Sequence, residues 1–467
     1  MKNISIISSY PRRGQLHSDT TSGVASYTKN MLKALGAQAE LAITVWAEVF
    51  DGEREGVYEE DGLTVKRIFK PGNLPSLWSM YKQIHARRTD SIIVALDSHM
   101  VGGSILTIIF LWQLILLKWS GKDVHILLHK VIANWKAHEK NPIKRFVARI
   151  YATLYYTLVL AGSHTAVVFE DRLRDQLESM ALQYRLRGAI EWIAHSIGWM
   201  FIGGRKLLSH IPKIRRRVAD LTHVSSQKKA GVKRATQNKI VKRIEDMLSW
   251  QPTQVRVIPH AVEDVKPIEK AAARRRLRLD PNAYYVLCFG FFSPHKGLDE
   301  LISMWPKGKS IRLILAGGEY PHKTGSTAYR RYVRRLQHRA SKAGITITGF
   351  VPEKKIPLYF GACDVVVLPY RTFVASSGPL ALAFAYEKPV LMSGALSGYF
   401  ESRDFKKVLT TSAITKHELT FVFESERFQQ SLRDILHNLR RSSDFSRSMK
   451  HMRTWKNIAA QYNELVK

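Results

Sequence analysis

The chain has 467 residues, which is long for a single core and enough for two domains of ordinary size. With 45% apolar residues and ten Trp, the composition is globular and excludes disorder over the whole chain. Its 72 Lys and Arg against 39 Asp and Glu give a net charge of +33. Such an excess favours a polyanionic partner: nucleic acid, anionic lipid or a phosphorylated substrate.

The cysteines and the N-terminus indicate a cytoplasmic protein. Cys288 and Cys363 each lie in an apolar run, which suits a reduced protein without disulfides. The start, "MKNISIISSYPRRG", lacks the basic region and long apolar stretch of a signal peptide. The apolar segment 105–117 has thirteen residues, whereas a bilayer-spanning helix needs about 20. We expect it to form a buried or interfacial helix.

In the first third of the chain, short β-branched segments alternate with helical patterns. Strands are predicted at 4–9, 91–96, 124–129 and 164–169, and helices at 24–35 and across the apolar segment. Continuous apolar strands that alternate with helices predict a parallel sheet covered on both faces. We therefore expect residues 1–180 to form a Rossmann-like N-terminal domain.

The alternation stops at residues 181–251. Aromatic and apolar residues fill 186–212, and 213–250 is densely basic. We interpret this region as an inserted helical pair or a partly ordered basic arm. Two alternatives stay open: a solvated cationic hairpin without a ligand, or a membrane-surface element whose aromatic rings enter the headgroup region while Lys and Arg meet anionic lipids.

A second alternating unit follows the insertion. Strands are predicted at 254–262, 284–290, 311–318, 345–351, 364–370 and 388–393, with helices at 297–304, 326–343 and 378–386. They predict a second doubly wound sheet over residues 252–450, with a ligand crevice at the carboxyl ends of its strands. The last segment, 451–467, contains an amphipathic helix that we expect to pack back on the N-terminal domain.

A cation at a strand-to-helix turn is the first candidate site. In "GFFSPHKGLDELI" (290–302), Gly290 ends a strand and Lys296 precedes a helix. The ammonium and the nearby backbone N–H groups would converge on an anion such as a diphosphate. Gly23 opens the first helix on the opposite wall, where a missing Cβ allows close approach to phosphate or sugar.

A hydroxyl-rich stretch before a later helix is the second candidate. Ser376, Ser377 and Gly378 precede the helix at 378–386, whose N–H groups favour an anion. A hydroxyl-rich N-cap would look the same without any ligand. Both interpretations stay open at this point.

Seven stretches together resemble a known family. "VIPHAVED", "FGFFSPHKGLDELI", "LAGGEYP", "ITGFVPEKKIPLYFGACDVVVLPYR" and "SSGPLALAFAYEKPV" resemble, in order and spacing, the C-terminal half of retaining GT-B glycosyltransferases of group 1 (family 4-like). "SSYPRR" and "SGVASYTKNML" resemble their N-terminal glycine loop and first helix. The likeness covers residues 1–180 and 252–467. It implies two facing Rossmann-like domains, a nucleotide-diphosphate sugar donor and retention of configuration.

The resemblance also implies roles for single residues. It places Lys296 on the departing phosphate, and Gly290 and Gly23 beside the donor. Phe350, Val351 and Pro352 match the loop whose backbone reads the nucleobase. His129 ends a predicted strand where the family often has a His near the transferred sugar, although a His at a strand end is also typical of packing. Asp97 and His99 are further candidates.

The chain departs from the family's pattern at three positions. Phe291 stands where many relatives carry Arg, and Val374 and Leu382 stand where many carry a pair of Glu. Two explanations stay open. In an active branch without the Glu pair, Arg371 would supply the second cation; in an inactive relative, the protein would bind without transferring.

We therefore expect a metal-independent, retaining glycosyltransferase without a cofactor, since the sequence has no Asp-x-Asp and no His/Cys cluster at metal-ligand spacing. The expected acceptor is lipid-linked or an envelope polysaccharide, and the basic insertion would hold the enzyme on the inner face of the membrane. The alternative is an inactive GT-B-like protein that binds nucleic acid or other anionic partners through residues 205–243, with the steep salt dependence such binding shows.

Overall fold

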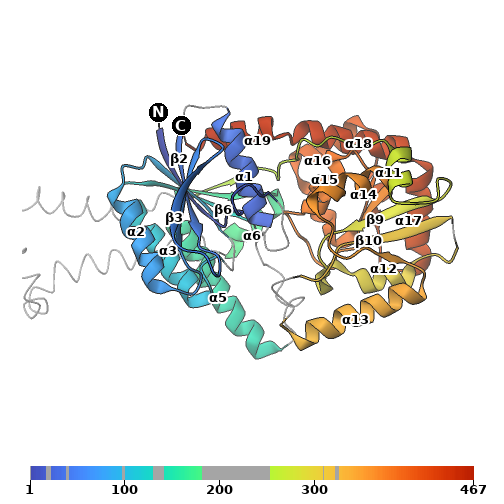
Figure 1. Ribbon diagram of the computed structural model, residues 1–467, viewed down its shortest axis with the longest axis horizontal. Helices are drawn as coiled ribbons and strands as arrows, with labels where there is room; N and C mark the ends of the chain where they lie inside the picture. Colours follow the sequence, from blue (N-terminus) through green and yellow to red (C-terminus); the bar gives the residue numbers. More distant parts are fainter. Residues whose placement is uncertain are drawn as a thin grey trace, which may run out of the picture.

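The computed structural model places two α/β domains side by side (Figure 1). It describes residues 2–16, 23–37, 41–96, 100–129, 141–180, 253–308, 310–320 and 325–466. The basic insertion, Asp97 and His99 lie outside these described residues.

The N-terminal domain is built on an eight-stranded sheet of order β3-β4-β2-β1-β5-β6-β7-β8. Its strands are β1 (Lys2–Ser8), β2 (Leu41–Glu48), β3 (Gly56–Glu60), β4 (Leu63–Phe69), β5 (Ser91–Leu96), β6 (Asp123–Leu128), β7 (Thr165–Val168) and β8 (Gln254–Val257). Neighbouring strands pair in parallel, except for the antiparallel hairpin of β3 and β4. The carboxyl ends of the parallel strands therefore meet at one edge of the sheet.

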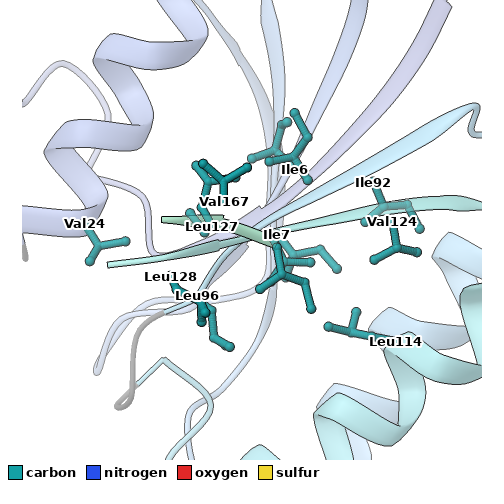
Figure 2. Packing of buried hydrophobic residues seen from close by; sticks show 14 of the residues in the cluster. Ile6, Ile7, Val24, Ile92, Leu96, Leu114, Val124, Leu127, Leu128 and Val167 are labelled. Carbon is teal, nitrogen blue, oxygen red and sulfur yellow. The ribbon is translucent and has the colours of Figure 1, made fainter. Parts of the chain in front are cut away.

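Helices cover both faces of this sheet. They are α1 (Gly23–Gly36), α2 (Leu74–Ala86), α3 (Ser104–Trp119), α5 (Pro142–Ala161) and α6 (Asp171–Met180). Figure 2 shows Val24 of α1 and Leu114 of α3 approaching the buried strand residues Ile7 and Leu127 from opposite sides. Strands that are apolar on both faces fit this double cover.

The second sheet has six parallel strands in the order β11-β10-β9-β12-β13-β14. They are β9 (Tyr284–Phe289), β10 (Ile311–Ala316), β11 (Thr346–Ile347), β12 (Val365–Leu368), β13 (Val390–Ser393) and β14 (Thr420–Phe421). The helices around it are α11 (Lys270–Arg276), α12 (Leu298–Met304), α13 (Thr327–Lys342), α14 (Ile356–Ala362), α15 (Gly378–Ala385), α16 (Arg403–Thr411), α17 (Ser425–His437) and α18 (Leu439–Met452). Two doubly wound sheets confirm the predicted fold class.

The last helix, α19 (Trp455–Asn463), packs against α1 of the N-terminal domain. The hydroxyl oxygens of Tyr27 and Tyr462 lie 3.0 Å apart, and Lys2 donates a hydrogen bond to the carbonyl oxygen of Val466 at 3.0 Å. The chain therefore crosses from the second domain back to the first near Arg453, where Val262 donates its N–H to the Arg453 carbonyl at 2.7 Å.

The position of β8 differs from the domain boundary that we expected at residue 252. We assigned 254–262 to the second unit, but β8 extends the first sheet, with Gln254 opposite Thr165 of β7. A short apolar pattern indicates a strand without indicating its partner. The crossing into the second domain follows β8.

The apolar segment 105–117 forms the centre of α3, which lies on the sheet through Phe110, Leu111 and Leu114. Its other face leaves Trp112 and Trp119 exposed. Among the described ranges, no helix combines the length and apolarity that crossing a membrane requires.

Candidate functional site

Lys296 lies at the carboxyl edge of the second sheet. It ends the 3-10 turn Pro294–Lys296 (η2), which follows β9, and Gly297 then begins the turn into α12. Gly297 has a φ of +63°, and a Cβ there would clash with the carbonyl oxygen of Pro369. Because this conformation and this close contact both require glycine, the Lys-Gly pair has a fixed geometry.

The Lys296 ammonium lies directly against Gly290. An ideal Cβ on Gly290 would lie 2.6 Å from Lys296 Nζ and 3.5 Å from Pro379 Cγ. Pro379 belongs to the first turn of α15. The cation and the start of a helix, with its unpaired backbone N–H groups, thus flank the same glycine. This juxtaposition suits an anion.

The electrostatic state of Lys296 points the same way. Burial lowers the pKa of its ammonium to about 8. Within the described ranges, no carboxylate forms an ion pair or hydrogen bond with it. A half-buried ammonium loses hydration, and an anionic ligand would compensate that loss.

Arg371 reaches the same loop with its charge already balanced. Its guanidinium contacts Glu300 and Asp299 at 2.7 Å each and donates to the carbonyl oxygen of Pro294, also at 2.7 Å. Its backbone N–H donates to the His295 carbonyl at 2.8 Å. These contacts tie Arg371 to the turn that carries Lys296. The contact that we expected between Arg371 and the phosphate stays a prediction.

The stretch Ser376, Ser377 and Gly378, here called the serine loop, has its hydroxyls engaged in structural contacts. Ser377 caps α15, since its Oγ accepts from the N–H of Leu380 at 3.3 Å. Ser376 donates to the carbonyl oxygen of His129 at 2.9 Å, across the two domains. Gly378 begins α15 and is exposed. The backbone of this first turn is the part that remains able to meet an anion.

His129 follows β6 and is buried at the domain interface. Its ring lies 5.3 Å from Tyr27 and 4.9 Å from Phe169, and within the described residues its Nε2 has no hydrogen-bond partner. Burial, followed by the charge of His260, lowers the pKa of His129 to about 3. The imidazole is therefore neutral. The structure brings His129 to the serine loop, and its contact with a sugar stays a prediction.

The residues predicted to read the nucleobase, Phe350, Val351 and Pro352, lie beside Phe291. Phe350 is 44% exposed and stacks on Phe291, with 6.1 Å between centroids and 18° between planes. Val351 is buried and Pro352 is exposed. The residue that replaces the Arg of many relatives thus extends an aromatic surface at the ends of β9 and β11.

Gly23 begins α1 and is exposed, and a Cβ on it would meet nothing within 4 Å. Packing alone therefore does not require glycine at this position. Its proposed contact with the ligand stays a prediction.

A buried ion cluster between the domains gave no recognisable signal in the sequence. Arg453 donates to Asp404 at 2.6 Å and to Glu170 at 3.2 Å, and Glu170 belongs to the N-terminal domain, two residues after the end of β7. Burial raises the pKa of Glu170 to about 8, which is consistent with one buried cation between two carboxyl groups. The cluster fixes the domains at the crossing point.

Comparison with known proteins agrees with this geometry. Residues 283–412 match the family described as glycosyl transferases group 1, and this range contains Lys296, Arg371 and the serine loop. A D-inositol 3-phosphate glycosyltransferase from Acidothermus cellulolyticus is 28% identical over 138 residues. That match spans 27% of this chain and only 30% of the relative's length.

Solved structures match over nearly the whole chain. Sucrose-phosphate synthase from Thermosynechococcus elongatus superposes with a TM-score of 0.63 at 16% identity, over 100% of this chain and 98% of that one. Anabaena HepE in complex with UDP-glucose gives 0.57 at 12% identity, over 99% of both chains. WaaG, a glycosyltransferase involved in lipopolysaccharide biosynthesis, gives 0.57 at 11%, over 99% of both.

The architecture is therefore that of the GT-B glycosyltransferases, as expected from the sequence. Within it, residues 283–412 are the part that is similar to the glycosyl transferases group 1 family.

Proposed function

We propose that this protein transfers a sugar from a nucleotide-diphosphate donor to an acceptor hydroxyl. The main observation behind this proposal is the position of the Lys296 ammonium. It is half-buried beside Gly290 and the first turn of α15, with no carboxylate partner in the described part of the chain. A leaving diphosphate needs its charge balanced where it develops. The group 1 match over this region supports the assignment.

The aromatic surface at Phe291 and Phe350 supports a nucleotide donor. A half-exposed ring pair beside Lys296, which has no carboxylate partner among the described residues, offers a stacking surface for a base and a contact for phosphates. Anabaena HepE, which shares the fold, is described in complex with UDP and with UDP-glucose. A uridine diphosphate sugar is therefore the first donor to test.

The proposed chemistry retains configuration and needs no metal. The bond between the anomeric carbon and the phosphate oxygen breaks while the acceptor oxygen bonds to the same face of the sugar. The acceptor proton passes to the departing phosphate oxygen, and Lys296 stabilises the charge that remains. Transfer that persists in excess chelator, with product of the donor's anomeric configuration, would agree with this mechanism; an inverted product would contradict it.

Lys296→Ala tests the donor site, with Lys406→Ala as the matched control because Lys406 is exposed on α16. We expect the first variant to keep its melting temperature and lose thermal stabilisation by sugar nucleotides and turnover, while the control keeps both. Near-normal turnover in Lys296→Ala would refute the assignment. Nucleic-acid binding in the absence of any sugar-nucleotide binding would support the alternative class.

We also propose that the enzyme works on a lipid-linked or envelope polysaccharide acceptor at the inner face of the membrane. Helix α5 exposes one apolar stripe, at spacings of three and four residues: Ile143 74%, Phe146 64%, Val147 59%, Ile150 55% and Leu154 45% exposed. Lys144, Arg145 and Arg149 lie on the same helix. The adjoining helix α3 adds exposed Trp112 and Trp119. Apolar stripes with basic flanks are typical of interfacial helices.

Vesicle sedimentation tests the membrane proposal. We expect the full chain to pellet with anionic vesicles and stay in the supernatant with neutral ones. Phe146→Ser with Ile150→Ser should weaken pelleting, whereas Val57→Ser, at a comparably exposed position of the β3 edge, should not. Equal recovery with both vesicle types would refute the proposal. Deletion of 186–250 would separate the contribution of the basic insertion, which lies outside the described residues.

A further inference from the structure

A second cavity, distinct from the Lys296 site, lies at the carboxyl edge of the first sheet. It has a volume of about 330 Å³, and the residues that line it include four arginines, Arg12, Arg13, Arg54 and Arg67, together with Glu53 and Tyr58. Arg12 and Arg13 follow β1, Arg54 follows β2, and Arg67 lies in the last part of β4. The ends of three neighbouring strands thus bring positive charge to one cavity.

Arg67 is the fixed wall of this arginine pocket. It is 6% exposed and donates to the carbonyl oxygens of Pro11 at 2.5 Å and Glu48 at 2.9 Å and to the Tyr58 hydroxyl at 3.1 Å. Its guanidinium lies 4.6 Å from the centroid of the Phe50 ring. The Glu48 carboxyl nearby is itself buried, and burial raises its pKa to about 7. The positive charge of Arg67 is therefore only partly balanced.

The other three arginines leave the pocket with excess charge. Arg12 faces Glu53 at 3.2 Å, and Arg13 lies over the Tyr58 ring at 5.4 Å. In the described part of the chain, no carboxylate pairs with Arg13 or Arg54. Four guanidinium groups against one glutamate on the lining attract an anion. The planar guanidinium groups match phosphate or carboxylate oxygens, and contacts with aromatic rings hold those of Arg12, Arg13 and Arg67 in place.

The sheet order places this pocket on the same edge as the domain interface. Strands β4, β2 and β1 stand four, three and two positions from β6, which leads into His129. With about 4.8 Å between neighbouring strands, the pocket lies roughly 10–20 Å from the end of β6. A ligand group held there is therefore not at the reacting centre, although a ligand that spans this distance can reach both.

We propose that the arginine pocket binds an anionic group of the acceptor, a phosphate or a carboxylate, at a distance from the hydroxyl that reacts. The identification of the ligand as the acceptor rests on the proposed transferase function. The anion site itself depends only on the cavity and its arginines. It defines the acceptor class as a charged molecule longer than one sugar.

The test uses the full chain at low ionic strength and titrates inorganic phosphate, glucuronate and neutral glucose into it by calorimetry. The variant is Arg13→Gln with Arg54→Gln. The matched control is Arg334→Gln with Arg335→Gln, two exposed arginines of α13. We expect an anion to bind the parent and the control, with affinity about tenfold or more lower in the pocket variant. Binding of phosphate but not of glucuronate would indicate a phosphorylated acceptor. Binding of glucuronate but not of phosphate would indicate an acceptor that carries a uronate.

The outcomes that overturn the proposal are equally concrete. The first is equal anion affinity in the pocket variant and the parent. The second is glucose binding as strong as the binding of both anions. The third is anion binding that is lost in Lys296→Ala but kept in the pocket variant. UDP is titrated separately into the same proteins. Failure of UDP to bind the parent would count against the proposed donor, while the phosphate and glucuronate titrations would still decide whether the arginine pocket is an anion site.

Discussion

The protonation of Lys296 gives a quantitative test of the donor site. Burial lowers the pKa of its ammonium to about 8, and only the charged form balances a phosphate. If UDP binds the charged form alone, its apparent Kd is about twofold weaker at pH 8, and about tenfold weaker at pH 9, than for the fully protonated protein. Above about pH 7 the terminal phosphate of UDP is already ionised, so the ligand adds little further change. Calorimetric titration across this range measures the effect.

Lys296→Arg is the matched variant for this experiment. A guanidinium stays charged throughout the range, so the Kd of this variant for UDP should not change with pH, whatever its absolute value. A parent Kd that is equally flat would refute the reasoning, because the group with the lowered pKa would then make no contact with the diphosphate. A parent Kd that tightens as pH rises would refute it as well.

Four further variants test the surroundings of this lysine and the domain crossing. Gly290→Ala should cost about tenfold or more in UDP affinity by the same titration, because the new methyl group would lie 2.6 Å from Lys296 Nζ. Arg371→Gln should weaken UDP binding by about threefold to tenfold while the pKa that governs binding stays near that of the parent, if Arg371 acts by holding the turn that carries Lys296; unchanged UDP affinity would argue against any such role. Arg453→Met should lower the free energy of unfolding by about 3–5 kcal/mol in urea titrations. Because the pKa of Glu170 is raised from 4.5 to about 8, the folded form binds the extra proton and stability falls as pH rises between these values; Glu170→Gln should remove that slope, and an unchanged slope would show that another group causes it.

The buried strands were the most predictable part of the fold. The run 91–96 was predicted from its continuous apolar pattern and forms β5 with the same bounds, Ser91–Leu96. The hairpin of β3, the edge strand, and β4 beside it was not predicted, because both strands mix polar with apolar residues. Local pattern also could not assign β8 to a sheet, since the pairing with β7 joins segments on either side of the insertion.

The same limit applies to the candidate site. Lys296 could be identified locally, because a strand, a turn and a helix follow one another along the chain around it. The ion pairs of Arg371 could not be identified in this way, because its partners Asp299 and Glu300 lie 72 and 71 residues earlier in the sequence. Whether an arginine is available to a ligand depends on which carboxylates the tertiary fold brings to it, and no short pattern contains that information.

The separation of the two candidate anion sites has an electrostatic reason. A donor diphosphate and an anionic acceptor repel each other, and a single cation such as Lys296 could not balance both. If the acceptor's charge stays in the arginine pocket, roughly 10 Å or more along the sheet edge from the end of β6, its distance from that strand end, where His129 meets Ser376, exceeds the Debye length of about 8 Å at physiological ionic strength. In water, two unit charges about 15 Å apart repel by only about 0.3 kcal/mol, even before salt screens them. Dividing the positive charge between the two domains would therefore let the protein bind two anions at once, with only the acceptor hydroxyl brought close to the departing phosphate.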